Sequence, residues 1–265
     1  MRPCPGRETR ALTDRPSVSV CMATYNGARY LREQIDSILV QLQPGDELVI
    51  VDDASSDDSV AIAESMESPL VAVHRNARNR GYVRSFERAL GLARGDVLLL
   101  ADQDDIWTEG RVDALVGATR SGAVAASNLV LLDSGMPLRS PITGRPWLLR
   151  SSDDGRVIRN ELRILAGDAP YFGCAMAVRR DGLDIVLPFP DFLDESHDLW
   201  IASSANVAGE LVHVEMPTVM RRVHQDNASS SRPRGVVEAL RSRLLLIRLW
   251  REALRRRSAR SGSRS

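Results

Sequence analysis

Two clusters of carboxylate side chains follow short apolar runs in the first 105 residues of the chain. The clusters are Asp52 and Asp53 after residues 48–51, and Asp102, Asp104 and Asp105 after residues 97–101. Such runs are typical of buried parallel strands, and open α/β sheets bind ligands beyond the carboxyl ends of these strands. Two acidic clusters at one sheet edge repel each other unless a cation lies between them. The sequence therefore predicts a divalent metal that carries a nucleotide or a sugar phosphate.

Each acidic cluster also has a purely structural alternative. The second cluster could be an acidic turn that caps a helix beginning near Thr108, and residues 55–57 could cap a helix after the first cluster. Three Asp within four residues bring a repulsion that a helix cap does not need, so ligand binding is favoured for the second cluster. Asp52 and Asp53 are favoured for a ligand as well, because they stand directly at a strand end.

Alternating patterns predict the elements that must position these carboxylates. Apolar runs predict strands over residues 17–23, 47–51, 70–74 and 96–101, and helical spacing predicts helices over residues 28–42, 55–66 and 81–93. The resulting β-α-β-α-β-α-β order predicts a parallel sheet with helices on both faces. The fold class is therefore α/β, and the first half is expected to bind a nucleotide.

The second half alternates less regularly. It is expected to contain strands over residues 123–132, 171–178 and 211–214, and helices over residues 160–166 and 195–207. Residues 133–155 hold several Gly, Pro and Ser residues and predict a long loop. A long amphipathic helix is expected from Pro233 to about Arg257.

Composition limits the class of protein. The chain has 265 residues, of which 43% are hydrophobic and 26% are charged, as expected for a soluble globular α/β protein. The three Cys are far apart, which argues against a disulfide framework and favours buried thiols in a reducing compartment. Neither a spanning apolar stretch nor a signal sequence is apparent. We therefore expect a cytoplasmic location, with a loose extension over residues 1–16.

Three segments together resemble glycosyltransferase family 2, whose fold is called GT-A. They are residues 20–26 (VCMATYN), residues 51–57 (VDDASSD) and residues 102–107 (DQDDIW), and the last resembles the rhamnosyltransferase-like branch in particular. The resemblance covers roughly residues 17–229. It implies a mostly parallel, Rossmann-like nucleotide-binding sheet flanked by helices. The nucleotide-sugar half is expected over residues 17–107 and the acceptor half over residues 108–231.

The resemblance also implies roles for single residues. The nucleotide-sugar donor is expected to contact Ala23, Thr24, Tyr25, Asp52, Asp53, Arg80, Gly81, Asp102 and Arg222. Asp104 is the expected ligand of a Mn²⁺ or Mg²⁺ ion, assisted by Asp102. His224 is either a third ligand or a contact of the diphosphate, with a structural histidine as the alternative.

The acceptor side is implied by two later segments. Gly173 belongs to a segment that resembles the acceptor side of the family, and residues 197–200, which end with Trp200, resemble the family's acidic motif. Within that motif Asp198 is the expected general base, which removes a proton from the acceptor hydroxyl in an inverting transfer. Asp194 and Glu195 lie close by and are competing candidates for that role.

The last 34 residues have a different character. From Arg232 onward the chain carries eleven Arg and only two Glu, arranged around an apolar stripe. A helix of this kind can lie at an anionic membrane surface, and packing on the domain or within a homodimer is the alternative. No nucleic-acid-binding module is recognisable.

Together these features predict an inverting, metal-dependent glycosyltransferase of cell-surface polysaccharide synthesis. The donor is a nucleotide sugar, with dTDP-rhamnose as the first expectation from the resemblance, and the acceptor is a glycan or a lipid-linked glycan. Two alternatives stay open at this point. One is a nucleotidyltransferase acting on sugar phosphates, although residues 24–27 lack its Gly-rich phosphate loop with a basic residue. The other is a non-catalytic nucleotide-sugar-binding module.

Overall fold

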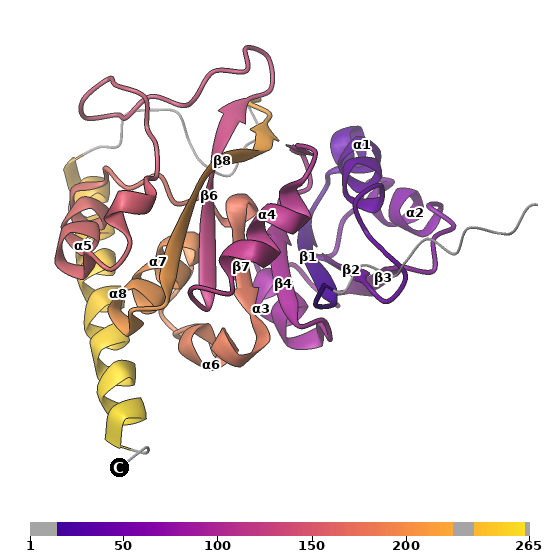
Figure 1. Ribbon diagram of the computed structural model, residues 1–265. Helices are drawn as coiled ribbons and strands as arrows, with labels where there is room; N and C mark the ends of the chain where they lie inside the picture. The colour runs from indigo at the N-terminus through magenta and orange to yellow at the C-terminus, as the bar shows by residue number, and fades with distance from the viewer. Residues whose placement is uncertain (1–14, 225–235, 263–265) are drawn as a thin grey trace, which may run out of the picture.

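A single curled sheet runs through the protein and carries helices on both faces (Figure 1). The computed structural model describes residues 15–224 and 236–262. The strand order is β3-β2-β1-β4-β7-β6-β8-β5. The strands are β1 (Val18–Thr24), β2 (Glu47–Asp52), β3 (Val71–Arg75), β4 (Val97–Ala101), β5 (Ile106–Trp107), β6 (Val124–Leu131), β7 (Met176–Arg179) and β8 (Leu211–Arg221).

The helices connect these strands and confirm the expected alternation in the first hundred residues. They are α1 (Ala28–Leu39), α2 (Ser59–Glu64), α3 (Tyr82–Leu92), α4 (Arg111–Ala118), α5 (Val157–Ala166), α6 (Leu183–Val186), α7 (His197–Ala208) and α8 (Val236–Gly262). Short 3-10 turns cover Ser151–Asp153, Gly173–Ala175 and Arg180–Gly182. Strands β1 to β4 pair in parallel, so their carboxyl ends meet at one sheet edge.

Strict alternation along the central strands divides the core between the two sheet faces. In β1, Cys21 packs into one apolar cluster while Val20 and Met22 pack into the other. Helices α1 and α4 contribute to the second cluster, and α3, α6, α7 and α8 contribute to the first. Because every residue of β4 is buried, the acidic loop after it starts from a rigid support.

The second half differs in detail from the sequence expectation. The expected strand over residues 171–178 begins only at Met176, because Gly173–Ala175 form a 3-10 turn. Strand β7 pairs antiparallel with both β4 and β6, and β8 pairs parallel with β6. Strand β8 also extends to Arg221, well beyond residue 214, because a register shift lets it follow β6 to its end. This extension carries residues 219–221 to the edge where the acidic loop lies.

Helix α8 packs on the globular core instead of standing apart from it. Leu246, Leu249 and Ala253 are buried in the same apolar cluster as α7. Arg256 lies over the Trp200 ring at 4.7 Å, and Arg257 donates a hydrogen bond to the Val207 carbonyl. One face of the basic tail therefore belongs to the hydrophobic core. Residues 225–235, which precede it, lie outside the described residues.

Candidate functional site

One pocket of about 420 Å³ opens at the edge where the parallel strands end. It brings together residues from β1, the acidic loop after β4, the turn before β7 and the start of α7. Ten of the residues expected from the sequence line it: Ala23, Thr24, Tyr25, Asp53, Gly81, Asp102, Asp104, Gly173, Glu195 and Asp198. The two acidic clusters and the expected base therefore share one cavity, although they are far apart in the sequence.

Asp53 organises the loop before α3. Its Oδ2 accepts a hydrogen bond from the backbone N–H of Gly81 at 2.8 Å, and its Oδ1 accepts one from the N–H of Arg80 at 2.9 Å. The Asn76 amide also donates to Oδ1, at 2.7 Å. Asp53 is 2% exposed. Its charge is thus held by backbone and amide donors, which explains how an acidic residue persists at this buried strand end.

Gln103 fixes the loop after β1 against the acidic loop. Its side-chain oxygen accepts hydrogen bonds from the Thr24 hydroxyl at 2.7 Å and from the Tyr25 N–H at 2.8 Å. A Cβ atom at Gly27 would collide with this amide, so the turn requires glycine there. Gln103 could not be assigned this role from sequence alone, because its partners lie 78 and 79 residues away.

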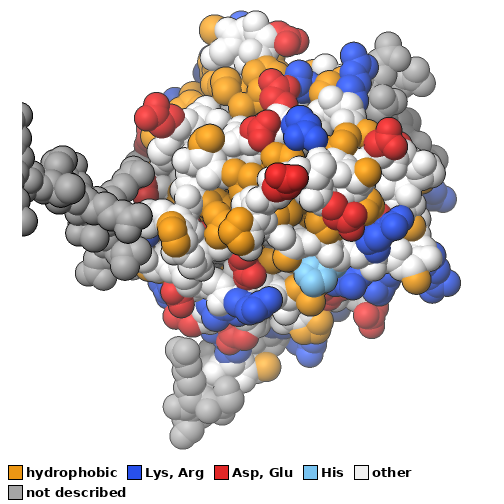
Figure 2. Space-filling model, turned by 90° about the vertical axis from the view of Figure 1, so that its right-hand side faces the viewer, with side chains coloured by type: hydrophobic (Ala, Val, Ile, Leu, Met, Phe, Trp, Pro, Cys, Tyr) orange, Lys and Arg blue, Asp and Glu red, His pale blue; other side chains and the backbone are white. Residues whose placement is uncertain are grey.

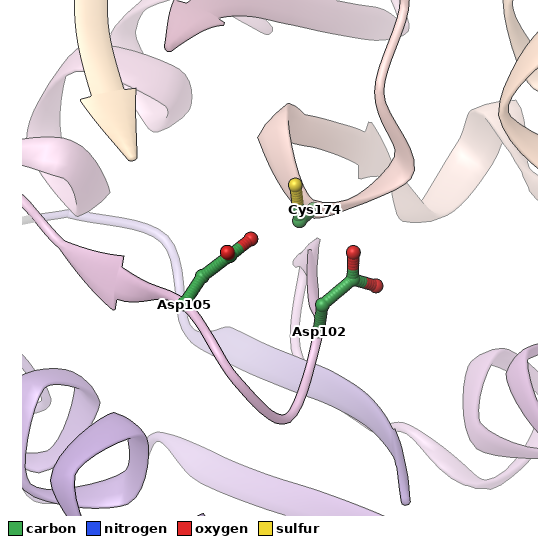
Figure 3. A group of neighbouring side chains, drawn as sticks. All are labelled: Asp102, Asp105 and Cys174. Atoms are coloured by element: carbon green, nitrogen blue, oxygen red, sulfur yellow. The ribbon is translucent and has the colours of Figure 1, made fainter. Parts of the chain in front are cut away.

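Asp102 and Asp105 lie on either side of a tight turn, facing Cys174 from the 3-10 turn before β7 (Figure 3). Ligand atoms of the three side chains all lie within 4.8 Å of one another. Burial and the nearby carboxylate of Asp105 raise the pKa of Asp102, and burial with the nearby Asp104 raises that of Asp105. Both pKa shifts mean that it is unfavourable to keep all the carboxylates of this cluster ionised at once.

Two arginines partly offset this charge. Arg111 is fully buried and donates hydrogen bonds to the carbonyls of Leu100 at 3.0 Å and Cys174 at 2.6 Å. Burial lowers the pKa of Arg111 to about 10, which leaves it charged at neutral pH. Arg221 lines the pocket and lies over the Phe172 ring at 5.0 Å. Arg221 also favours the charged forms of Asp102, Asp105 and Asp198.

The donor set of this loop fits a hard divalent cation. The Oδ2 atom of Asp105 is buried without a hydrogen-bond partner among the described residues, so one anionic oxygen lacks compensation. Carboxylate oxygens are the ligands that Mg²⁺ and Mn²⁺ prefer. The thiol of Cys174 is less suited, because burial raises its pKa well above the ordinary value and keeps it protonated.

Asp104, His224 and Arg222 meet at one side of the acidic loop. The Nε2 atom of His224 lies 2.7 Å from Oδ2 of Asp104. The Arg222 side chain donates to the Asp104 carbonyl and pairs with Glu33 at 2.6 Å, and its backbone N–H donates to Asp105 Oδ1. The structure thus brings the expected metal ligand Asp104 to the expected partner His224. Arg222 and His224 themselves are not among the residues that line the pocket.

Asp198 stands in the first turn of α7 and reaches the pocket wall. Burial raises the pKa of its carboxyl group to about 6, a range suited to a base near neutral pH. The residue before this helix, Ser196, has a left-handed backbone with φ of 61°, which is unusual for a residue other than glycine. Its N–H donates to the Tyr82 hydroxyl at 3.0 Å. That contact fixes the helix start against α3.

Four other expected site residues are not among those that line the pocket. Asp52 is fully buried and accepts a hydrogen bond from the Ser55 N–H, so it supports the loop. Trp200 is also fully buried and donates its indole N–H to the Val186 carbonyl, as a packing residue does. Asp194 and Arg80 are exposed beside the pocket.

Several pocket residues escaped the sequence analysis as functional candidates. They are Tyr82, Ser85, Phe86, Gln103, Phe172, Ser196, His197 and Arg221. Aromatic residues at helical spacing, such as Tyr82 and Phe86, predict a core face from sequence alone. Only the structure shows that both residues lie where α3 borders the pocket, so that they line it.

The surface on the side of β3, α1 and α2 faces the viewer in Figure 2. Figure 2 shows acidic, basic and hydrophobic side chains intermixed on that side. Within the described parts of the chain, no helix combines the length and apolar composition that crossing a membrane requires.

Comparison with known families and proteins gives a consistent result. The family model "Glycosyl transferase family 2" matches residues 19–183. The putative glycosyltransferase EpsE of Bacillus subtilis is 36% identical over 104 residues, which cover 38% of this chain and 37% of that protein. The putative teichuronic acid biosynthesis glycosyltransferase TuaG of the same organism is 31% identical over 101 residues, covering 37% and 40%. The chain thus spans well under half the length of these curated relatives.

Solved structures show the same architecture. S. aureus TarS 1–349 in complex with UDP-GlcNAc superimposes with a TM-score of 0.63 at 19% identity, covering 91% of this chain and 72% of that one. Its complex with UDP gives a TM-score of 0.59 at 19% identity, covering 87% and 65%. At this identity the likeness concerns the fold, and it confirms the expected GT-A arrangement with its mostly parallel sheet.

Proposed function

The chain belongs to glycosyltransferase family 2, and on that premise we propose that it is an inverting glycosyltransferase of polysaccharide synthesis. The donor is a nucleotide sugar, with dTDP-rhamnose as the first candidate, and the acceptor is a hydroxyl of a glycan or a lipid-linked glycan. One observation carries the proposal: Asp53, Asp104 and Asp198 line a single pocket. Polysaccharide synthesis is also supported by relatives such as TuaG.

Residues of the β1 and α3 loops form the donor end of this pocket. Thr24 and Tyr25, held by Gln103, and Gly81, held by Asp53, line the pocket beside the carboxyl end of β1. Loops whose conformation is already fixed in this way suit a flat nucleobase and its ribose. The likeness to a TarS structure that contains UDP supports the same assignment.

The acidic loop forms the diphosphate end. A divalent cation would be held there by Asp104 and Asp102, with His224 beside them, and when bound it offsets charge on the leaving diphosphate. Arg221 also lines the pocket and adds a fixed positive charge there. The phosphate oxygens would then meet cationic groups in place of the unscreened carboxylates.

Asp198 acts as the general base in this proposal. Its carboxylate accepts the proton from the acceptor hydroxyl as that oxygen bonds to the anomeric carbon and the bond to the diphosphate oxygen breaks. Glu195 also lines the pocket and remains a competing candidate, while Asp194 lies outside the lining. Burial raises the pKa of Asp198 to about 6, and the residue stands in the first turn of α7 at the pocket wall, so Asp198 is preferred.

The test is a transfer assay with a panel of nucleotide sugars, Mn²⁺ or Mg²⁺, and mass spectrometry of the products. Release of a nucleoside diphosphate together with a glycosylated acceptor, or with free sugar from hydrolysis, is expected. Formation of a nucleotide sugar from a nucleoside triphosphate and a sugar phosphate would instead establish the nucleotidyltransferase alternative. Binding without any product, across the whole panel, would favour the non-catalytic module.

The outer face of α8 is proposed to contact an anionic membrane surface, where a lipid-linked acceptor would lie. Its exposed apolar residues recur at helical spacing, at Leu240, Leu244, Ile247 and Leu254. Exposed arginines, among them Arg241, Arg248, Arg251 and Arg255, flank or interrupt this stripe. Apolar residues edged by arginines suit the headgroup region of an anionic bilayer. A homodimer contact is the competing use of the same face.

A further inference from the structure

His197, the first residue of α7, has an unusual environment within the pocket. Its imidazole is 5% exposed and lines the cavity. The ring stacks on Phe86 with centroids 4.4 Å apart and an interplanar angle of 18°, and Tyr82 meets it edge-on at 5.5 Å. Phe189 lies at 6.4 Å. Apart from the cavity side, aromatic rings surround much of this histidine.

Neither ring nitrogen of His197 has a hydrogen-bond partner among the described residues. A neutral imidazole carries one donor and one acceptor, and leaving both buried and unmet is unfavourable. His213, the other buried histidine, shows the usual solution: its Nδ1 lies 2.6 Å from Asp154 Oδ1 and its Nε2 lies 2.9 Å from the Tyr171 hydroxyl. The difference indicates that the partners of His197 are not supplied by the described protein groups.

A glycine at position 173 leaves space for this ring at the pocket wall. A Cβ atom on Gly173 would lie 2.6 Å from Nε2 of His197, so any other residue at position 173 would displace the imidazole. Gly173 itself lines the pocket. The Nε2 atom is therefore buried beside Gly173, at the wall of the cavity.

The chemistry of the ring selects among ligands. Burial lowers the pKa of His197 to about 3, so the imidazole is neutral at physiological pH. Glu195 and Asp198 line the same part of the pocket, and their negative charge disfavours a phosphate there. A hydroxyl group is uncharged, and it can either donate to the unprotonated ring nitrogen or accept from the protonated one.

We infer that His197 hydrogen-bonds a hydroxyl group of a sugar bound in the pocket and thereby determines which sugar the enzyme accepts. The inference rests on the proposed function. The hydroxyl belongs either to the sugar being transferred or to the acceptor sugar, and the chemistry of recognition is the same for both. A site that hydrogen-bonds a substrate hydroxyl discriminates strongly against analogues that lack it.

The test compares His197→Phe with His213→Phe as a matched control, since Phe keeps a ring of similar shape in both. Thermal unfolding without ligand is measured first. His197→Phe removes no protein hydrogen bond and is expected to leave the melting temperature unchanged or raised. His213→Phe removes two hydrogen bonds and is expected to lower it by several degrees.

Ligand binding is then measured by calorimetry with dTDP-rhamnose and UDP-GlcNAc, and with dTDP and UDP alone. His197→Phe is expected to bind the nucleoside diphosphates as the wild type does. If the hydroxyl is on the donor, its affinity for the accepted nucleotide sugar falls about tenfold. If the hydroxyl is on the acceptor, donor affinity is kept and the acceptor KM rises about tenfold. His213→Phe, assayed below its melting temperature, should change neither value.

The outcomes separate the two claims. Unchanged donor affinity together with unchanged acceptor KM in His197→Phe would overturn the inference and leave the proposed function standing. A similar loss of affinity for dTDP or UDP alone would also overturn it, because the histidine would then position the nucleotide. A wild-type protein that neither binds nor turns over any nucleotide sugar would refute the proposed function and, with it, this inference.

Discussion

The Nε2 atom of His224 lies 2.7 Å from Oδ2 of Asp104, although 120 residues separate them in the chain. This contact joins the end of β8 to the acidic loop after β4. The Tyr30 ring lies against His224 with centroids 4.9 Å apart, which limits the positions that the imidazole can take. The carboxylate and the imidazole hydrogen-bond each other here, so an oxygen and a nitrogen that could serve the proposed divalent cation lie side by side.

Replacing Asp104 by Asn should therefore lower turnover by on the order of a hundredfold or more, as loss of one electrostatic stabiliser does. The amide keeps the shape of the side chain but removes its charge. Initial rates of sugar transfer, measured with and without added Mn²⁺, test this. EDTA should abolish wild-type activity. Full activity of Asp104→Asn, or wild-type activity that EDTA leaves intact, would contradict the metal assignment.

The rate of transfer should rise with pH through a value near 6. Burial raises the pKa of Asp198 to about 6, and a general base acts only when deprotonated, so activity is lost as pH falls below that value. This loss of activity at low pH is the acidic limb of the pH profile of kcat, which is measured at saturating donor and acceptor. A flat profile between pH 5 and pH 7 would argue against Asp198 as the base.

Replacing Arg221 by Gln should move that acidic limb to higher pH. The positive charge of Arg221 favours the carboxylate form of Asp198, so its removal raises the pKa of the base. The expected shift has a defined direction, whereas a general loss of stability would lower the whole profile without moving it. Arg120→Gln, an exposed arginine outside the pocket lining, serves as the control and should leave the limb in place.

Replacing Arg111 by Met should destabilise the fold. Arg111 is fully buried and donates to the Cys174 carbonyl, the Leu100 carbonyl and the Thr218 hydroxyl. Its removal leaves these acceptors and the nearby carboxylates uncompensated, which costs about 3 to 5 kcal/mol of unfolding free energy. Urea unfolding followed by circular dichroism checks this value. A change below about 1 kcal/mol would show that the local structure rearranges around the substitution.

The membrane proposal is tested on the exposed face of α8, because removal of the helix would uncover the core around Leu249. Leu240→Gln with Leu244→Gln should reduce binding to vesicles that contain anionic lipid, and high salt should weaken wild-type binding. Unfolding stability should change little. Equal vesicle binding by variant and wild type would eliminate the membrane role, and loss of dimer mass in the variant would point to subunit packing.

The sequence predicted the parts of the site that depend on local pattern. Asp53 and Asp102 stand directly at the ends of apolar runs, and parallel pairing of β1 with β2 and β4 then places both at one edge. Arg111 could not be predicted, because its importance arises from the Cys174 carbonyl, 63 residues away. The packing of the tail could not be predicted from sequence either. Its apolar stripe was visible, but only packing against α7 divides it into a buried side with Leu249 and an exposed side with Leu244.

The anomeric configuration of the product tests the central claim most directly. In-line attack by an acceptor hydroxyl, deprotonated by Asp198, replaces the diphosphate from the opposite side of the anomeric carbon in one step. The ¹H NMR spectrum of the product formed by the wild type should therefore show the configuration opposite to that of the donor, and Asp198→Asn should form it about 10² to 10⁴ times more slowly. A product that retains the donor configuration, or an unimpaired Asp198→Asn, would contradict the account.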